Sequence, residues 1–236
     1  MNLLLTVCAR GGSKGLKNKH LLPLGGKPLI AWTFEQAKRW GKASRIVCST
    51  DSDDIAAAAR AAGAEVPFVR PVELASDTAG KVPVVRHALR KCEEEGTRYD
   101  AVVDLDATAP LRTSEDLDRC LERFIAVRPQ VLFSVVAARK NPYFNMIERR
   151  KDGSLGIVMS LASPTLRRQD APEVFELNAS IYIYDAAALR EGAFPGVLQS
   201  RFDICEMAED AAFDVDTETG LHIVQALMRR RGWIPG

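Results

Sequence analysis

Short apolar runs and segments with helical spacing alternate along this chain, and that alternation restricts its fold more than any other feature. The apolar runs are typical of strands buried on both faces, and they occupy residues 3–8, 45–50, 65–69, 101–105 and 131–136. Between them, apolar side chains recur at helical intervals at residues 28–37, 55–62, 82–92 and 113–127. Because consecutive parallel strands need a crossover helix, the pattern predicts a doubly wound, mostly parallel α/β sheet.

The alternation then stops. Turn-forming sequences such as Lys140-Asn141-Pro142 and Asp152-Gly153-Ser154 follow, with short strand-like pieces between them. We therefore expect a small β-rich lobe inserted at about residues 139–176. Two more strands and a last helix are expected at residues 180–185, 202–207 and 217–230. A chain of 236 residues can bury one large core, and no linker divides it, so we expect a single domain over residues 1–236.

Composition excludes two classes of partner. The chain has 32 Lys and Arg residues against 31 Asp and Glu residues, so it lacks the general basic field that nucleic acids or anionic membranes require. Its five cysteines are scattered without a Cys-x-x-Cys motif, which is typical of reduced thiols in a cytoplasmic protein. The first apolar run is too short to span a membrane, and we interpret it as a buried strand rather than a signal peptide.

A glycine-bearing basic loop follows the first expected strand. Gly12 and its neighbouring glycines allow the backbone to approach a ligand closely and to turn N–H groups toward an anion. Arg10, Lys14 and Lys19 add positive charge, and Ser13 adds a hydroxyl group. The loop therefore suits a polyphosphate, although its spacing is neither that of a Walker A loop nor that of a dinucleotide fingerprint. A basic surface loop without a ligand is the alternative that the spacing leaves open.

Two carboxylates near the end of the chain form a second candidate site. Asp214 and Asp216 are two positions apart, so on an extended segment they project to one face. Such a pair can hold one Mg²⁺ ion, or two, together with phosphate oxygens. The alternative is an acidic strand end in which Asp216 or Thr217 caps the following helix.

These motifs acquire a common meaning from a resemblance. The sequence ARGGSKG, followed by GGKPLIAWT, resembles the N-terminal signature of the CMP-sugar synthetases, the acylneuraminate cytidylyltransferase family. Further matches follow in order over nearly the whole chain: Ser49-Thr50-Asp51, Arg70-Pro71, Thr108-Ala109-Pro110-Leu111-Arg112, Arg168-Gln169, Asn178, and Asp214-Val215-Asp216-Thr217-Glu218. The resemblance implies a Rossmann-like nucleotidyltransferase fold whose small lobe forms a homodimer. It also implies a reaction in which CTP and a nonulosonic acid give CMP-sugar and pyrophosphate.

The resemblance also implies roles for individual residues. Arg10, Lys14 and Lys19 would hold the triphosphate, with Gly12 and Ser13 in the same loop. Asp214 and Asp216 would bind Mg²⁺, and Asp214 is a candidate to take the proton of the attacking hydroxyl.

Outside the loop and the acid pair, the resemblance assigns fewer positions. Arg168 would face the carboxylate of the sugar acid, with Arg167 as the alternative, and Asn178 would position the sugar. Arg70, expected just after a third strand, would contact the nucleotide. Lys81 is a further candidate for the nucleotide, although we favour a solvated position at a helix N-terminus for it.

Three positions depart from the family pattern, near the expected base and sugar sites. Asp106 stands where the family usually has a Gln that reads the base, His20 stands where Asn is usual, and Ala179 replaces a Gly. An ionised Asp only accepts hydrogen bonds, which suits the adjacent donors of guanine better than the ring acceptors of cytosine. A guanylyltransferase acting on a sugar phosphate is therefore the nearer alternative, and a non-catalytic nucleotide-binding protein is the more distant one.

Overall fold

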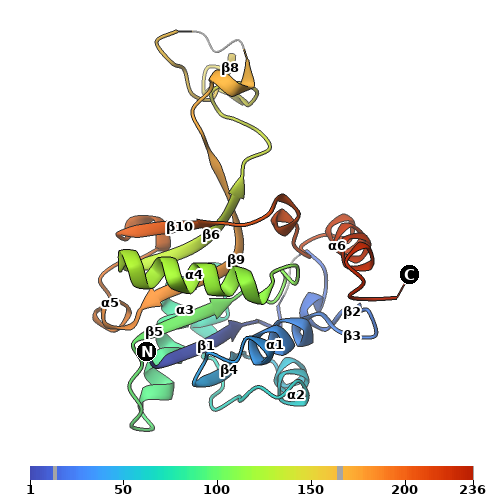
Figure 1. The fold of residues 1–236 in the computed structure, drawn as a ribbon, viewed down its shortest axis with the longest axis vertical. Coiled ribbons are helices and arrows are strands. Elements are labelled where there is room, and N and C mark those ends of the chain that lie inside the picture. The colour runs from blue at the N-terminus through green and yellow to red at the C-terminus, as the bar shows by residue number, and fades with distance from the viewer. Residues whose placement is uncertain (13–14, 164–166, 236) are drawn as a thin grey trace.

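The computed structural model describes residues 1–12, 15–163 and 167–235 of the chain. Its centre is one sheet of six strands (Figure 1), which are β1 (Leu3–Cys8), β4 (Arg45–Ser49), β5 (Ala101–Leu105), β6 (Val131–Ala137), β9 (Phe175–Asp185) and β10 (Phe202–Glu206). Their order across the sheet is β10-β6-β9-β5-β1-β4. All neighbouring pairs are parallel except those of β9, which runs antiparallel to both β5 and β6. The predicted doubly wound, mostly parallel sheet is confirmed.

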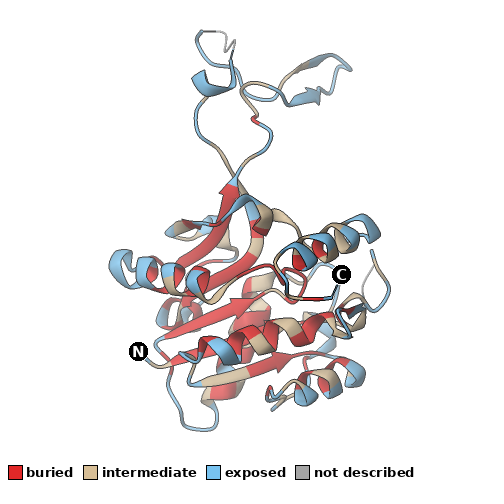
Figure 2. Ribbon diagram, turned by 45° about the vertical axis from the view of Figure 1, so that its right-hand side comes forward, coloured by how far each residue is buried: buried red, intermediate tan, exposed pale blue. Residues whose placement is uncertain are grey.

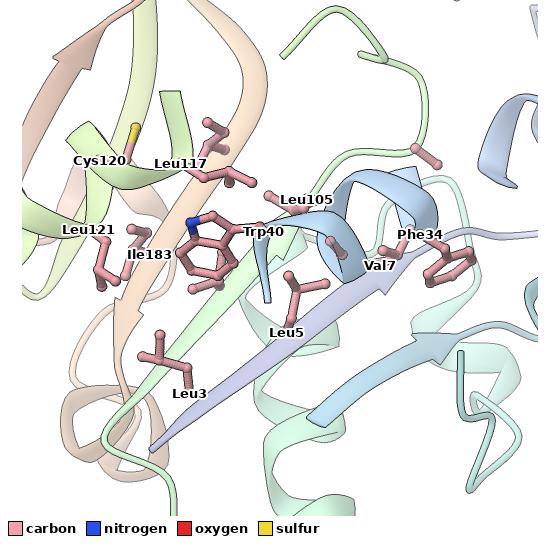
Figure 3. Packing of buried hydrophobic residues seen from close by; sticks show 14 of the residues in the cluster. Leu3, Leu5, Val7, Phe34, Trp40, Leu105, Leu117, Cys120, Leu121 and Ile183 are labelled. Carbon is pink, nitrogen blue, oxygen red and sulfur yellow. The ribbon is translucent and has the colours of Figure 1, made fainter. Parts of the chain in front are cut away.

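Helices cover both faces of the sheet. On one face lie α1 (Leu29–Trp40), α2 (Asp53–Ala61) and α4 (Ser114–Val127), and on the other lie α3 (Lys81–Glu93) and α5 (Ala186–Glu191). The alternation of side chains along β1 explains why both faces are apolar. Leu3 and Leu5 pack under α1 and α4 (Figure 3). Leu4 packs on the opposite face, under α3. Apart from residues 65–69, the continuous apolar runs of the sequence are therefore strands of this sheet, with helices on both of its faces.

Local capping fixes where the helices begin. Ser52 precedes α2, and its side chain accepts a hydrogen bond from the backbone N–H of Ile55. Thr113 precedes α4 and forms a reciprocal capping box with Asp116. Both helices therefore begin directly after a residue whose side chain caps the first turn.

Two expectations about elements are corrected. Residues 65–69 do not form a strand, because only Glu65 makes a bridge, to Val47, before Pro67 removes a donor and Val69 turns out to solvent. The strand expected at residues 180–185 is longer than predicted, because β9 already begins at Phe175. Its pairing with β6 contains a register shift, and Ala179 within β9 has a positive φ. The short helix α5 was not foreseen.

A small hairpin and the last helix pack together beside the central sheet. The strands β2 (Pro23–Leu24) and β3 (Lys27–Pro28) are joined by Gly25 and Gly26, both with positive φ. They pack with the last helix, α6 (Glu218–Arg230), around a separate apolar cluster that includes Leu24 and Met228.

The segment between β6 and β9 leaves the body of the molecule. Residues 138–174 are called here the arm. Its described residues project away from the sheet as two extended segments that lead to a small tip (Figures 1 and 2). The tip carries a hairpin of β7 (Ile147–Arg149) and β8 (Leu155–Ile157), and most of its residues are exposed. Among the described residues, no helix combines the length and the apolar character that a membrane span requires.

Candidate active site

A pocket of about 270 Å³ opens at the carboxyl ends of β1 and β5. This is the edge at which an open α/β sheet presents its ligand-binding loops. Side chains from the loops after β1 and β5, from the segment between α2 and α3 and from the start of α3 line the pocket, among them Arg10, Lys19, His20, Arg70, Lys81 and Asp106. Six of the positions singled out from the sequence are therefore brought to one place.

The acid pair lies beside the basic loop. Val215 is fully buried and its N–H donates to the carbonyl of Thr108, which fixes Asp214 and Asp216 on either side of it. Lys19 Nζ lies 2.5 Å from Asp216 Oδ1 and so joins the loop to the acid pair. Gly15 is required at this junction, because a Cβ there would lie 2.6 Å from the carbonyl oxygen of Asp216.

Asp214 has an unusual proton affinity. Burial, and then the negative charges of Asp216 and Asp106, raise the pKa of Asp214 to about 6. Asp214 is partly buried and Asp216 beside it is exposed, and their charges repel each other, so a bound cation or a proton would relieve that repulsion. Across the described part of the chain, no cluster of three or more metal-ligating side chains was found, so the pair supplies at most two protein ligands.

Lys81 lies between two carboxylates at the floor of the pocket. Its Nζ is 3.1 Å from Asp104 Oδ2 and 3.3 Å from Asp106 Oδ2, and it lies over the ring of Tyr182. The solvated position that we favoured for Lys81 is wrong, because the strand end delivers two acids to it. Burial alone would lower the pKa of Lys81, but the two carboxylates outweigh it and hold the pKa well above its usual value.

Asp106 is correspondingly held as a carboxylate. Burial would raise its pKa, but the Lys81 ammonium and the hydrogen bonds from Thr108 outweigh that effect and keep the pKa below its usual range. Its Oδ1 accepts from both the N–H and the hydroxyl of Thr108, at 3.1 and 2.9 Å. Asp106 therefore faces the pocket in one fixed, charged form.

His20 stays neutral in this setting. It is 5% exposed, and burial followed by the charge of Lys19 lowers its pKa to about 4. Its Nδ1 is buried and forms no hydrogen bond within the described chain. The residue that replaces the usual Asn thus contributes an uncharged ring to the pocket wall.

The remaining pocket cations are already engaged. Arg10 forms an ion pair of 2.7 Å with Asp77 across the pocket mouth. Arg70 is buried and donates to Ser49, so it is held by the end of β4 rather than by the third strand that we expected. Gly12 lies in the same loop, and nothing within 4 Å would obstruct a Cβ there. Ser13 and Lys14 lie outside the described residues.

The two residues expected at the sugar lie elsewhere. Arg168 is exposed on the arm, where its Nη2 donates to the carbonyl of Ala138 at 2.9 Å, and it does not line the pocket. Asn178 is buried in β9, where its Oδ1 accepts from the hydroxyl of Ser134 and its Nδ2 donates to the carbonyl of Ala211. The side chain of Asn178 thus ties β6 to the segment that leads to the acid pair.

Sequence reasoning missed two buried supports of the site. Asp104 is fully buried, accepts a hydrogen bond from the hydroxyl of Thr6 and pairs with Lys81. An acidic residue inside an otherwise apolar strand could have indicated such a buried, paired carboxylate. Arg112 is also fully buried and donates to the carbonyls of Asp106 and Ala109, so it fixes the loop that carries Asp106. Arg112 belongs to the motif Thr108-Ala109-Pro110-Leu111-Arg112, but residue spacing did not predict that its side chain would point into the protein.

Comparisons with known proteins show the family to which the chain belongs. A family model described as cytidylyltransferase matches residues 5–189. The chain is 42% identical to post-translational flagellin modification protein B of Campylobacter coli over 97% of this chain and 96% of that protein. It is 40% identical to CMP-N,N'-diacetyllegionaminic acid synthase of Campylobacter jejuni over 99% of this chain and 97% of that protein.

A solved structure supports the fold independently. CMP:2-keto-3-deoxy-manno-octonic acid synthetase complexed with CTP superposes with a TM-score of 0.71 at 18% identity, covering 98% of this chain and 100% of that one. Such a low identity bears on the fold alone, whereas the family model and the two relatives cover most of the sequence. The chain belongs to the cytidylyltransferase family.

Proposed function

We propose that this protein transfers the cytidylyl group of CTP to a nonulosonic acid, giving CMP-sugar and pyrophosphate. The observation that carries the proposal is the contact between Lys19 and Asp216, which joins a basic glycine loop to a carboxylate pair beside one pocket. The named activity of the relative from C. jejuni makes N,N'-diacetyllegionaminic acid the first sugar to test, with pseudaminic and sialic acids next.

The chemistry divides between the two sides of the pocket. The anomeric hydroxyl of the sugar attacks the α-phosphorus of CTP, and the bond to the departing pyrophosphate breaks. Arg10 and Lys19, together with Lys14, bind the triphosphate and stabilise the charge that develops on the pyrophosphate. The carboxylate of Asp214 is the proposed acceptor for the proton of the attacking hydroxyl.

The acid pair fits a magnesium ion. Asp214 and Asp216 supply hard oxygen donors whose charges repel each other, one partly buried and one exposed, which suits a divalent cation that keeps several waters. Mg²⁺ bound there would orient the phosphate oxygens and lower the pKa of the sugar hydroxyl. Asp216 would exchange its bond to Lys19 for this role, which would free Lys19 for the phosphates.

The arm supports a homodimer as part of the proposal. Large apolar side chains lie exposed along it, including Met146, Ile147 and Leu155. An apolar groove of about 790 Å³ runs from the base of the arm over β6 and β10. A second copy that covers these surfaces would remove them from water. Because Arg168 lies on the arm, its proposed contact with the substrate carboxylate requires the arm of a second copy to reach the pocket.

One assay separates this function from its alternatives. Purified protein is incubated with Mg²⁺, each nucleoside triphosphate in turn, and the three nonulosonic acids, and pyrophosphate release is measured. We expect release with CTP and at least one of the acids, and none after chelation of the metal. Release with GTP and a sugar phosphate would replace the proposal with the guanylyltransferase, and nucleotide binding without any release would replace it with the non-catalytic protein.

The location of the protein is part of the same proposal. Its cysteines are free thiols, which supports a cytoplasmic location.

A further inference from the structure

We infer that Asp106 and Lys81 read the nucleotide base together: the carboxylate accepts from the amino group of cytosine, and the ammonium donates to the adjacent ring acceptor. The inference rests on the proposed function in one respect, since it takes CTP as the nucleotide. It assigns base selection to an ion pair, where the family pattern would use the amide of a single Gln.

The two side chains form one edge of the pocket. Lys81 Nζ and Asp106 Oδ2 are 3.3 Å apart, and both residues line the pocket. Their side chains retain 29% and 23% exposure, whereas that of Asp104 behind them retains none. A donor and an acceptor therefore lie next to each other at the only part of this acid–base cluster that a ligand can reach.

Both groups keep an unused hydrogen-bonding position. Asp106 Oδ1 is occupied by the N–H and the hydroxyl of Thr108, but among the described residues Oδ2 accepts only from Lys81 and can take a second donor. Lys81 has three N–H groups, of which its two carboxylate partners take two. The ring of Tyr182 supports the ammonium from one side, 4.6 Å from the ring centroid.

This arrangement matches cytosine and opposes uracil. Cytosine presents an amino donor beside a ring acceptor, which fits a carboxylate beside an ammonium. Uracil presents the reverse order, so its carbonyl would face the carboxylate and its ring N–H would face the ammonium. Each reversed contact leaves a polar group unpaired at a partly buried edge, which is the most effective way for a site to reject an analogue.

The ion pair also removes the difficulty that Asp106 poses. A carboxylate alone offers nothing to the ring acceptors of cytosine, but Lys81 supplies that donor from a neighbouring helix. Structural need alone does not account for the pair, because Asp104 already provides Lys81 with a fully buried counterion at 3.1 Å. Asp106 adds a second charge on the pocket side, where a ligand can use it.

Replacing Asp106 by Asn tests the pairing with little change in shape. The amide oxygen must face the fixed N–H of Thr108, so the amide nitrogen takes the position of Oδ2 and becomes a donor toward the base. Lys81 retains Asp104, so no buried charge is left unpaired. Asp106→Asn should then bind CTP more weakly and UTP more strongly.

The experiment measures dissociation constants for CTP, UTP and GTP by calorimetry without a sugar, so that it reports on the base whether or not turnover occurs. We expect the wild-type protein to prefer CTP over UTP by at least about 100-fold, and Asp106→Asn to reduce that ratio by at least about 10-fold. Lys81→Met should reduce the same ratio, and thermal melts establish whether each variant is folded. Asp203→Asn, which removes a carboxylate paired with Arg123 outside the pocket, is the matched control and should leave the ratio unchanged.

An unchanged ratio in a folded Asp106→Asn protein would overturn the inference, and so would a wild-type protein that binds GTP more tightly than CTP. Failure of the proposed function looks different: the nucleotide preferences would hold, but no pyrophosphate would appear with any nonulosonic acid.

Discussion

The pocket and the arm differ in whether their side chains find interaction partners within a single chain. In the pocket, the charged side chains already have partners: Lys81 has two carboxylates, Lys19 has Asp216, and Arg10 has Asp77. On the described part of the arm, several large apolar side chains are exposed instead, and Ile147 is 71% exposed. The charged side chains of the pocket are therefore already paired within one chain, whereas the exposed apolar side chains of the arm would need a surface outside the chain to become buried. Four predictions test this difference, beginning with the largest expected effect.

The acid pair should be indispensable to the chemistry and dispensable to the fold. Asp216→Asn keeps the shape of the side chain but halves the charge available to a metal, so turnover should fall at least about 100-fold. The side chain of Asp216 is 57% exposed, so the melting temperature should change little. Pyrophosphate release at saturating Mg²⁺ measures the first effect and calorimetry the second. Near-normal turnover that still needs Mg²⁺ would remove Asp216 from the metal site.

His20 should make the stability of the body depend on pH. Its pKa is about 4 in the folded chain against 6.5 when unfolded, so the unfolded chain binds more protons between those values. The stability contributed by the neutral ring is complete above the unfolded pKa and is lost as the pH falls toward the folded pKa. This one residue should cost roughly 2 kcal/mol of unfolding free energy between about pH 7 and about pH 5.

Urea unfolding at a series of pH values in wild-type protein and His20→Asn measures that cost. The variant carries the residue that the family pattern usually has, and its stability should fall less steeply over this range. His222→Asn, at an exposed position on α6, is the control for loss of a surface histidine. Equal slopes in wild type and His20→Asn would contradict a buried, neutral His20.

The arm should control self-association. Ile147→Glu places a charge at an apolar position on the exposed hairpin, so self-association should weaken at least about 10-fold by sedimentation velocity. If the arm of one copy completes the pocket of another, the same variant should keep its affinity for CTP and lose affinity for the sugar acid. Ile125→Glu changes an apolar residue that is 45% exposed on α4 of the body, and it should change neither property. A wild-type protein that is monomeric at assay concentrations would contradict the proposed dimer.

The same contrast explains what sequence reasoning could achieve. The body followed from local rules, because apolar runs buried on both faces and caps such as Thr113 are set by neighbours in sequence. The error at residues 65–69 arose because β propensity outweighed Pro67 in our interpretation. Ala179 adopts a positive φ of 52°, so a position where the family pattern has Gly keeps the backbone that glycine prefers, although the residue has changed.

The site was less accessible because its contacts are between distant segments. The basic loop and the acid pair could be named from their residue types, but their junction at Lys19 and Asp216 joins positions 197 residues apart. The partners of Lys81 come from the end of β5. The position of Lys81 at a helix N-terminus therefore did not indicate that two carboxylates would pair with it. For Arg168, the motif indicated a role but not that the arm would carry it away from its own pocket.

Arg168 offers the smallest effect and the sharpest distinction between pocket and arm. Arg168→Lys keeps the charge but loses the fork that binds a carboxylate in two places, so the KM for the sugar acid should rise about 5- to 10-fold while the affinity for CTP stays constant. Arg167→Lys is the matched control, because Arg167 is the adjacent arginine, is exposed, and pairs locally with Asp170. Steady-state kinetics with the sugar acid varied, together with calorimetry of CTP, separate the two residues. A larger rise in KM for Arg167→Lys would transfer the role to Arg167, and a fall in CTP affinity for Arg168→Lys would place the arm over the nucleotide instead of the sugar.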